Sequence, residues 1–358
     1  MPRLPARVLT AMAALALAGC SLSASGGSSP GGVASPGGTA LGGLLNGAGS
    51  TFQQTFQGVA ISSFTSVQSG ITVNYAGVGS GDGRDDLAAG QVNFAGSDSP
   101  IPADEQTHFK GKTVLYFPVV IGPITLSYNL PSVHKLRLSA PVVAGIFSGV
   151  ITTWNDPAIE ADNPGVSLPG TPITRAVRSD SSGTTANFTK FLVEAAGSAW
   201  DRGSDSVISW PAGSRASKGN DGVAQFVKST PGAIGYVDYA TAKAVGLTFA
   251  SVMNRDGIYV APSPTSAAAA ASQVGLDADL TFSSVWAAGA ASYPITYQSW
   301  DLVYAAQPNA NDARMLQAYL GYLLGAGQEL LPQLGYAPLP ASIDQLAQAQ
   351  LSKIGSER

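Results

Sequence analysis

Segments with apolar residues at helical spacing alternate with short runs of β-forming residues along most of the chain. Phe52, Phe56 and Phe64 recur at helical spacing, whereas Ile71, Val73 and Tyr75 alternate as they would in a strand. The same two patterns predict strands over residues 92–95, 113–129, 173–177, 233–237 and 293–304, and helices over 184–196 and 311–325. Strands that alternate with helices indicate an α/β fold.

The first twenty residues follow a different pattern. Arg3 and Arg7 precede an apolar run over residues 8–18, which is too short to cross about 30 Å of hydrocarbon and is typical of a signal peptide. The only Cys of the chain then follows in Leu17-Ala18-Gly19-Cys20, which resembles a bacterial lipobox. We expect residues 1–19 to be a lipoprotein signal peptide and Cys20 to carry palmitate as a membrane anchor. An ordinary signal peptide is the alternative.

Composition narrows the possible functions. Residues 21–45 are rich in Gly, Ser and Pro and carry no charge, so we expect a flexible tether over residues 20–45 that begins at Cys20. The length of 358 residues suggests two domains, and the formal charge of −4 disfavours a nucleic-acid partner. A single Cys excludes an intrachain disulfide, and the presence of only two His residues argues against a His-rich metal centre or a His-based enzyme. We therefore expect no metal and no cofactor.

Familiar catalytic and nucleotide-binding motifs are incomplete in this sequence. The glycines at 77, 79, 81 and 83 do not match G-x-G-x-x-G, because Asp82 occupies the place of the third glycine. Gly111-Lys112-Thr113 lacks the first glycine of a P-loop, since Gln106 stands there. The sequence contains no G-x-S-x-G nucleophile elbow. These observations argue against a nucleotide-binding protein and against a serine hydrolase.

Four segments are dense in small hydrogen-bond donors, most of them at predicted helix starts: residues 47–52, 77–81, 96–98 and 178–184. A helix N-terminus offers unpaired N–H groups and the positive end of the helix dipole. Several such ends directed at one point would hold a small tetrahedral anion, and Arg178 would add a guanidinium suited to oxyanions. Taken singly, each segment is better explained as a helix cap.

Specific sequence blocks carry a family resemblance over residues 47–340. They are GAGSTF at 47–52, NYAGVGSG at 74–81, NFAGSDSPI at 93–101, VRSDSSGTTANFTKFL at 177–192 and GAIGYVDYA at 232–240. In these blocks the chain resembles the periplasmic or lipoprotein phosphate-binding proteins of Pst-type ABC transporters. The resemblance implies an α/β fold of the two-lobed periplasmic-binding-protein type (type II). Each lobe would be a mixed β-sheet flanked by helices.

The resemblance also implies boundaries and ligands. Lobe I would comprise residues 46–124 plus 298–358 and lobe II residues 125–297, with hinge crossings near 122–125 and 296–299. The family's acidic residue that holds the arginine falls on Asp180. The implied phosphate ligands are Thr51 and Phe52 through their N–H groups and the Thr51 hydroxyl, with Ser80, Asp98, Arg178, Ser182, Gly183 and Thr184.

A carboxylate in this anion site has a chemical use. Ionised Asp98 can only accept a hydrogen bond, and phosphate near neutral pH still carries a proton to donate, whereas sulfate has none. A buried charge left unpaired costs several kcal/mol. The residues therefore predict that phosphate is preferred over sulfate.

The expected function is high-affinity binding of inorganic phosphate on the extracytoplasmic face of the cell membrane. The protein would deliver phosphate to an ABC transporter made of two permease subunits and an ATPase, and it would not be an enzyme. Two alternatives remain open: a surface sensory or interaction protein that keeps the phosphate-binding fold, and a cell-surface phosphatase.

Overall fold

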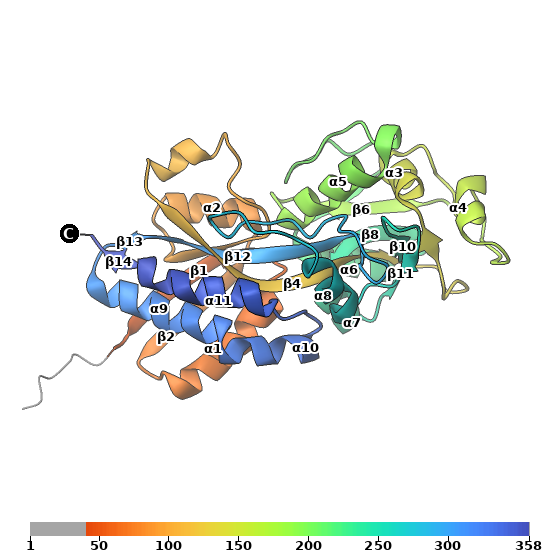
Figure 1. The fold of residues 1–358 in the computed structure, drawn as a ribbon. Helices are drawn as coiled ribbons and strands as arrows, with labels where there is room; N and C mark the ends of the chain where they lie inside the picture. Colours follow the sequence, from red (N-terminus) through yellow and green to blue (C-terminus); the bar gives the residue numbers. More distant parts are fainter. Residues whose placement is uncertain (1–40, 358) are drawn as a thin grey trace, which may run out of the picture. The chain divides into compact units, whose positions relative to one another are not determined.

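A mixed β-sheet of nine strands forms the centre of the computed structural model, which describes residues 41–357 (Figure 1). The predicted signal peptide, Cys20 and the tether up to residue 40 lie outside the described residues. The strands are β1 Gly43–Gly49, β2 Ile71–Gly77, β3 Phe94–Ser97, β4 Val114–Tyr128, β5 Arg137–Leu138, β6 Thr174–Arg178, β7 Arg215–Ser217, β8 Ala233–Asp238, β9 Thr248–Phe249, β10 Ser251–Met253, β11 Tyr259–Val260, β12 Thr296–Tyr304, β13 Ala306–Gln307 and β14 Gly355–Ser356.

Helices flank this sheet, which confirms the predicted α/β class. They are α1 Gln54–Val67, α2 Ser80–Ala88, α3 Ala140–Ser148, α4 Pro157–Asp162, α5 Gly183–Ala195, α6 Gly219–Ser229, α7 Tyr239–Val245, α8 Pro264–Ala271, α9 Ala310–Leu324, α10 Leu331–Leu334 and α11 Ala341–Gln350. Short 3₁₀ helices span Gln106–Phe109, Gly197–Ala199, Ala326–Leu330 and Leu351–Lys353. Among the described residues, no helix combines the length and apolarity needed to cross a membrane.

The main sheet is parallel toward its two edges and antiparallel in the middle. Its hydrogen-bonded order is β2-β1-β3-β12-β4-β8-β6-β7, and β9 adds to β4. On one side β1 runs parallel to β2 and β3, and on the other β6 runs parallel to β7 and β8. β12 lies antiparallel to both β3 and β4, and β4 lies antiparallel to β8. Two groups of parallel strands are thus joined through β4 and β12, which run side by side in Figure 1.

β4 changes its pairing partner partway along its length. It pairs with β12 as far as Pro123, opposite Thr296, and with β8 from Ile124 onward. The two prolines within β4 do not break it. Pro118 lies at the register shift between Ser299 and Trp300, a position where a sheet tolerates the missing N–H. β4 is therefore one continuous strand.

One predicted boundary needs correction. The predicted tether extends to residue 45, but β1 begins at Gly43 and Leu45 is fully buried, so the last three residues of that segment belong to the sheet. Ser263 is the N-cap of α8, and it forms a reciprocal capping box with Ser266.

A buried polar network lies between α1 and β12. Asp301 is fully buried, and Gln57 Nε2 donates to its two carboxylate oxygens at 3.2 and 3.1 Å. Gln57 also donates to Gln53 Oε1 at 2.9 Å, and Gln53 Nε2 donates to Ser299 Oγ at 2.7 Å. Burial raises the pKa of Asp301 to about 7, although the glutamine hydrogen bonds partly oppose this shift. Folding therefore favours the protonated form of Asp301.

The pKa of Asp301 predicts how stability varies with pH. Because its folded pKa lies above the ordinary pKa of an aspartic acid, the folded state binds more protons than the unfolded state between about pH 4 and 7. The free energy of unfolding of the ligand-free protein should fall as pH rises through that window. Asp301→Asn should make this fall shallower, as measured by urea denaturation at pH 5 and pH 8.

Burial also raises the pKa of Asp98 to about 6 and that of Asp238 to about 7, so the slope should shrink rather than vanish. The exposed Asp104→Asn serves as the matched control and should leave the slope unchanged. An unchanged slope in Asp301→Asn would contradict this assignment.

Candidate functional site

The predicted ligand residues gather at the carboxyl ends of the parallel strands. β1 leads into Thr51 and Phe52, β2 leads into Ser80, and β3 leads into Asp98. In the other group of strands, β6 ends in Arg178 and leads into α5. The crevice outside the carboxyl ends of such strands is where open α/β sheets bind ligands.

Asp98 is held from several sides. Its side chain is buried, and Ser299 Oγ donates to Oδ1 at 2.5 Å. Ser80 Oγ accepts from the Asp98 N–H at 3.2 Å and lies 3.5 Å from Oδ2. Burial raises the pKa of Asp98 to about 6, while hydrogen bonds from Ser299 and Ser50 and the charge of Arg178 pull it down. Above about pH 6, Asp98 is therefore an ionised group that only accepts.

Arg178 forms a buried pair with Asp180. Arg178 Nε donates to Asp180 Oδ1 at 2.9 Å, and Nη2 donates to Oδ2, in a two-pronged arrangement. Both side chains are almost completely buried. Burial alone would lower the pKa of Arg178, but Asp180 outweighs it, so the pKa rises and the guanidinium stays charged. Arg178 Nη1 is left to reach Thr184 Oγ1 at 3.4 Å.

The start of α5 supplies the next group. Ser182 is its N-cap and accepts from the Thr185 N–H at 3.1 Å, as a helix cap should. Gly183 follows at a very close approach between chain segments. A Cβ built on Gly183 would lie 2.6 Å from both Asp98 Cβ and Ser80 Oγ, so only glycine fits without a shift. The N-terminus of α5 therefore faces Asp98 directly.

Contacts between the two strand groups bring the predicted residues together. The Gly81 N–H donates to Ser181 O at 3.2 Å, and Asn187 Nδ2 donates to Asp98 O at 2.6 Å. Thr51 Oγ1 accepts from Asn220 Nδ2 at 3.0 Å. The residues so gathered are Thr51, Ser80, Asp98, Arg178, Asp180, Ser182, Gly183 and Thr184.

Phe52 differs from the expectation. Its N–H, which the resemblance assigns to the ligand, donates to Ser50 Oγ at 3.0 Å. Its ring is buried against Tyr297, with centroids 4.1 Å apart, and against Tyr336. In this structure the Phe52 ring therefore packs against Tyr297 and Tyr336, and its N–H already has a partner.

Two residues that touch this cluster are absent from the sequence prediction. Ser299 donates to Asp98, yet in sequence it is one small residue within a strand, with no local signal. Asn220 contacts Thr51 and Thr184 from the start of α6. A signal did exist for Asn220, because Gly219-Asn220 opens a helix with the same glycine and small polar residue as the four donor-rich segments.

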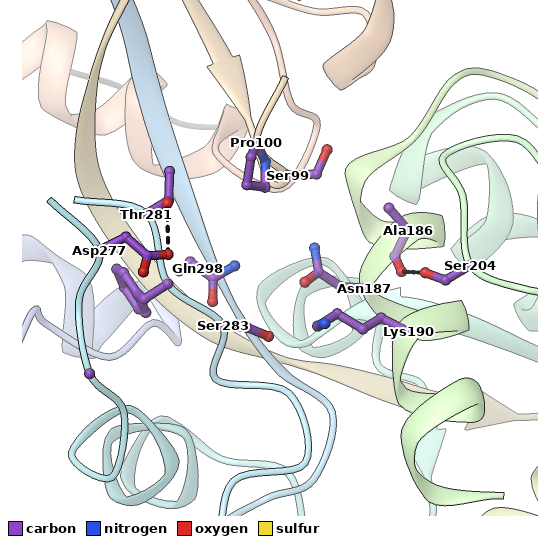
Figure 2. Close-up of a pocket in the computed structure, with 12 residues that line it drawn as sticks. Ser99, Pro100, Ala186, Asn187, Lys190, Ser204, Asp277, Thr281, Ser283 and Gln298 are labelled. Carbon is purple, nitrogen blue, oxygen red and sulfur yellow. Dashed lines mark hydrogen bonds between the residues drawn. The ribbon is translucent and has the colours of Figure 1, made fainter. Parts of the chain in front are cut away.

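A pocket of about 380 Å³ borders the cluster (Figure 2). Asn187 and Lys190 on α5 face Gln298 and Ser283 across it. Lys190 pairs with Glu194 at 2.7 Å and its side chain is 41% exposed, whereas the Arg178 side chain is buried among hydrogen-bond donors. Within residues 41–357, no group of three or more His, Cys, Asp or Glu side chains is placed to hold a metal ion. The Arg178 cluster is therefore the better anion site.

Comparison with known proteins identifies the family. The PBP superfamily domain matches residues 33–326. Phosphate-binding protein PstS 3 of Mycobacterium tuberculosis H37Rv is 37% identical over 306 residues, covering 83% of this chain and 82% of the relative. Phosphate-binding protein PstS of Pasteurella multocida is 35% identical over 316 residues, covering 86% of this chain and 89% of the relative.

A solved structure agrees on the fold. The high-affinity periplasmic phosphate-binding protein PfluDING, bound with phosphate, superposes with a TM-score of 0.72 at 23% identity, covering 86% of this chain and 93% of that one. Together with the sequence relatives, this confirms the resemblance drawn from the donor-rich segments. The chain belongs to the PBP superfamily and, within it, to the phosphate-binding protein PstS family.

Proposed function

We propose that this protein binds inorganic phosphate outside the cytoplasmic membrane and delivers it to the permease of a phosphate ABC transporter. The observation that carries the proposal is Asp98, a buried carboxylate set among hydrogen-bond donors and within the electrostatic reach of Arg178. Its family relatives are named as phosphate-binding proteins. Those names support a binding protein rather than a phosphatase.

The donor set suits a tetrahedral anion. The Arg178 guanidinium is held in place by Asp180, and the N-terminus of α5 adds N–H groups and a favourable dipole. The proposed ligands are Thr51, Phe52, Ser80, Asp98, Arg178, Ser182, Gly183 and Thr184. The Phe52 N–H would have to exchange its bond to Ser50 Oγ for one to the ligand.

Selectivity in this proposal comes from Asp98. A hydrogen phosphate ion donates its proton to the carboxylate, whereas sulfate sets oxyanion against carboxylate with nothing between them. A site built around a ligand's OH can reject an analogue that lacks it by about 10⁴–10⁵. Ser299 supports this role because its hydrogen bond to Oδ1 lowers the pKa of Asp98 and keeps it an acceptor.

Calorimetry with phosphate and sulfate at pH 7.5 tests this selectivity. The wild-type protein should bind phosphate, with sulfate weaker by about 10⁴. Asp98→Asn replaces the acceptor-only group by one that also donates. Phosphate binding should therefore weaken, and the preference for phosphate over sulfate should shrink by at least about tenfold.

Ser299→Ala should raise the pKa of Asp98, because it removes a hydrogen bond to the carboxylate. As the pH is lowered, sulfate should therefore begin to bind at a higher pH than in the wild-type protein.

Asp104→Asn, which is exposed, is the matched control and should keep the wild-type preference. Sulfate held as tightly as phosphate by the wild-type protein would rule out the proposed role of Asp98.

We propose further that the chain forms two lobes that close on the ligand. Lobe I would comprise residues 46–124 with 298–358, and lobe II residues 125–297. The change of partner along β4, from β12 to β8 between Pro123 and Ile124, supports crossings near 122–125 and 296–299. Ligand bridging both lobes would favour the closed form.

Hydrogen exchange monitors that closure. The Gly81 N–H donates to Ser181 O across the two groups of strands, so its exchange should slow when phosphate is bound. At a free phosphate concentration near 100 Kd, ligand linkage of about 2.7 kcal/mol corresponds to roughly 100-fold slower exchange for groups exposed only by opening. Peptides covering residues 77–83 and 180–186 report it, and peptides from α11 serve as controls. Equal exchange with and without phosphate would contradict closure.

The predicted anchor completes the proposal. Cys20 lies outside the described residues, and Leu17-Ala18-Gly19-Cys20 is its support. Palmitate on Cys20 and the tether after it would hold the binding domain at the outer face of the membrane, beside the permease and its ATPase.

A further inference from the structure

Asn220 occupies a position between the two groups of ligand residues. It is the second residue of α6 and its side chain is buried. Its Nδ2 lies 3.0 Å from Thr51 Oγ1 and 3.4 Å from Thr184 Oγ1. Thr51 follows β1, whereas Thr184 lies in the first turn of α5. One amide therefore contacts a hydroxyl from each side of the cluster.

The orientation of the Asn220 amide is fixed by its other end. Its Oδ1 accepts from the Asp238 N–H at 3.2 Å. Asp238 is fully buried at the end of β8, and a buried main-chain N–H requires an acceptor. The Asp238 carboxylate in turn accepts from the Thr241 N–H at 2.9 Å and caps α7. With the oxygen so placed, the NH₂ group must face the two threonines.

This orientation determines what the threonine hydroxyls can do. A hydroxyl has one proton to donate and two lone pairs that accept. Thr51 Oγ1 accepts from the Asn220 N–H at 3.3 Å and from its Nδ2, which uses both lone pairs. Thr184 Oγ1 accepts from Asn220 Nδ2 and from Arg178 Nη1, each at 3.4 Å. Each hydroxyl therefore has only its proton left to offer.

We propose that Asn220 is a positioning residue that makes the hydroxyls of Thr51 and Thr184 donors toward the bound anion. It fills their acceptor sites, so that they present protons to unprotonated oxygens of the ligand. A ligand proton is then accepted at Asp98, which lies against Gly183. This inference rests on the proposed function and adds the direction of two kinds of hydrogen bond to it: the hydroxyls of Thr51 and Thr184 donate to the ligand, and the Asp98 carboxylate accepts from it.

The strongest test is a double-mutant cycle on phosphate affinity, measured by calorimetry on the full chain at pH 7.5. The variants are Thr51→Val, which removes the hydroxyl but keeps the shape, Asn220→Ala, and the two combined. If Asn220 acts through the Thr51 hydroxyl, the combined loss should be smaller than the product of the single losses by about fivefold or more. A purely structural role for Asn220 would make the two losses multiply.

Asn187 provides the matched control. It is also a buried asparagine beside the site, but its Nδ2 donates to the main-chain oxygens of Asp98 and Gly183 rather than to a hydroxyl. Asn187→Ala should therefore combine with Thr51→Val multiplicatively, within about twofold.

Asn220→Asp is a second variant that tests the same role if Asn220→Ala does not fold. It keeps the acceptor for the Asp238 N–H but replaces the NH₂ donors by an oxygen that accepts. The threonine protons would turn toward it, so phosphate affinity should fall further than in Asn220→Ala, by about tenfold or more. Phosphate affinity in Asn220→Asp equal to wild type, or losses that multiply in the Thr51 cycle, would overturn the role of Asn220. Wild-type protein that gives no heat with phosphate would instead overturn the proposed function itself.

Discussion

The site depends on keeping the Asp98 carboxylate ionised while it is almost completely excluded from water. Burial alone favours the neutral acid, and the group is kept within reach of ionisation by donors from Ser299, Ser50 and Ser80 and by the charge of Arg178. Each of these residues comes from a different part of the chain. The fold must therefore bring several strand ends and one helix start to a single point, and the mixed sheet does so.

The arrangement of strands explains how that is achieved. Parallel strands end at a common edge, so the ends of β1, β2 and β3 bring Thr51, Ser80 and Asp98 together. The ends of β6, β7 and β8 likewise bring Arg178, Asn220 and Asp238 together. β4 and β12 belong to the antiparallel middle and hold the two groups in register. β12 also contributes Ser299, so one strand that connects the groups also sets the chemistry of Asp98.

Sequence reasoning predicts the parts of the proposed site that have a local signature. Ser80, Arg178 and Ser182 stand beside glycines at helix starts, and the resemblance added their roles and that of Asp98. Ser299 could not be found this way, because its importance arises from a strand pairing between residues about two hundred positions apart. Asn220 carries a local signal, because Gly219-Asn220 opens a helix. The start of β1 was misplaced because Gly43 and its neighbours continue the composition of the tether, and only burial of Leu45 marks them as sheet.

The low charge of the chain fits this chemistry. Asp180 neutralises Arg178, so the pair brings no net charge to the site and leaves a correctly aimed guanidinium instead. Most hydrogen bonds to the proposed ligand then come from neutral N–H and O–H groups, and the strength of these bonds depends on their direction. In the proposed site, direction is supplied by residues that do not touch the anion: Asp180 orients Arg178, Ser299 donates to Asp98, and Asn220 orients the threonine hydroxyls. A binding protein built in this way can select one oxyanion among several of similar size, because the pattern of donors and acceptors, rather than total charge, decides which ligand fits.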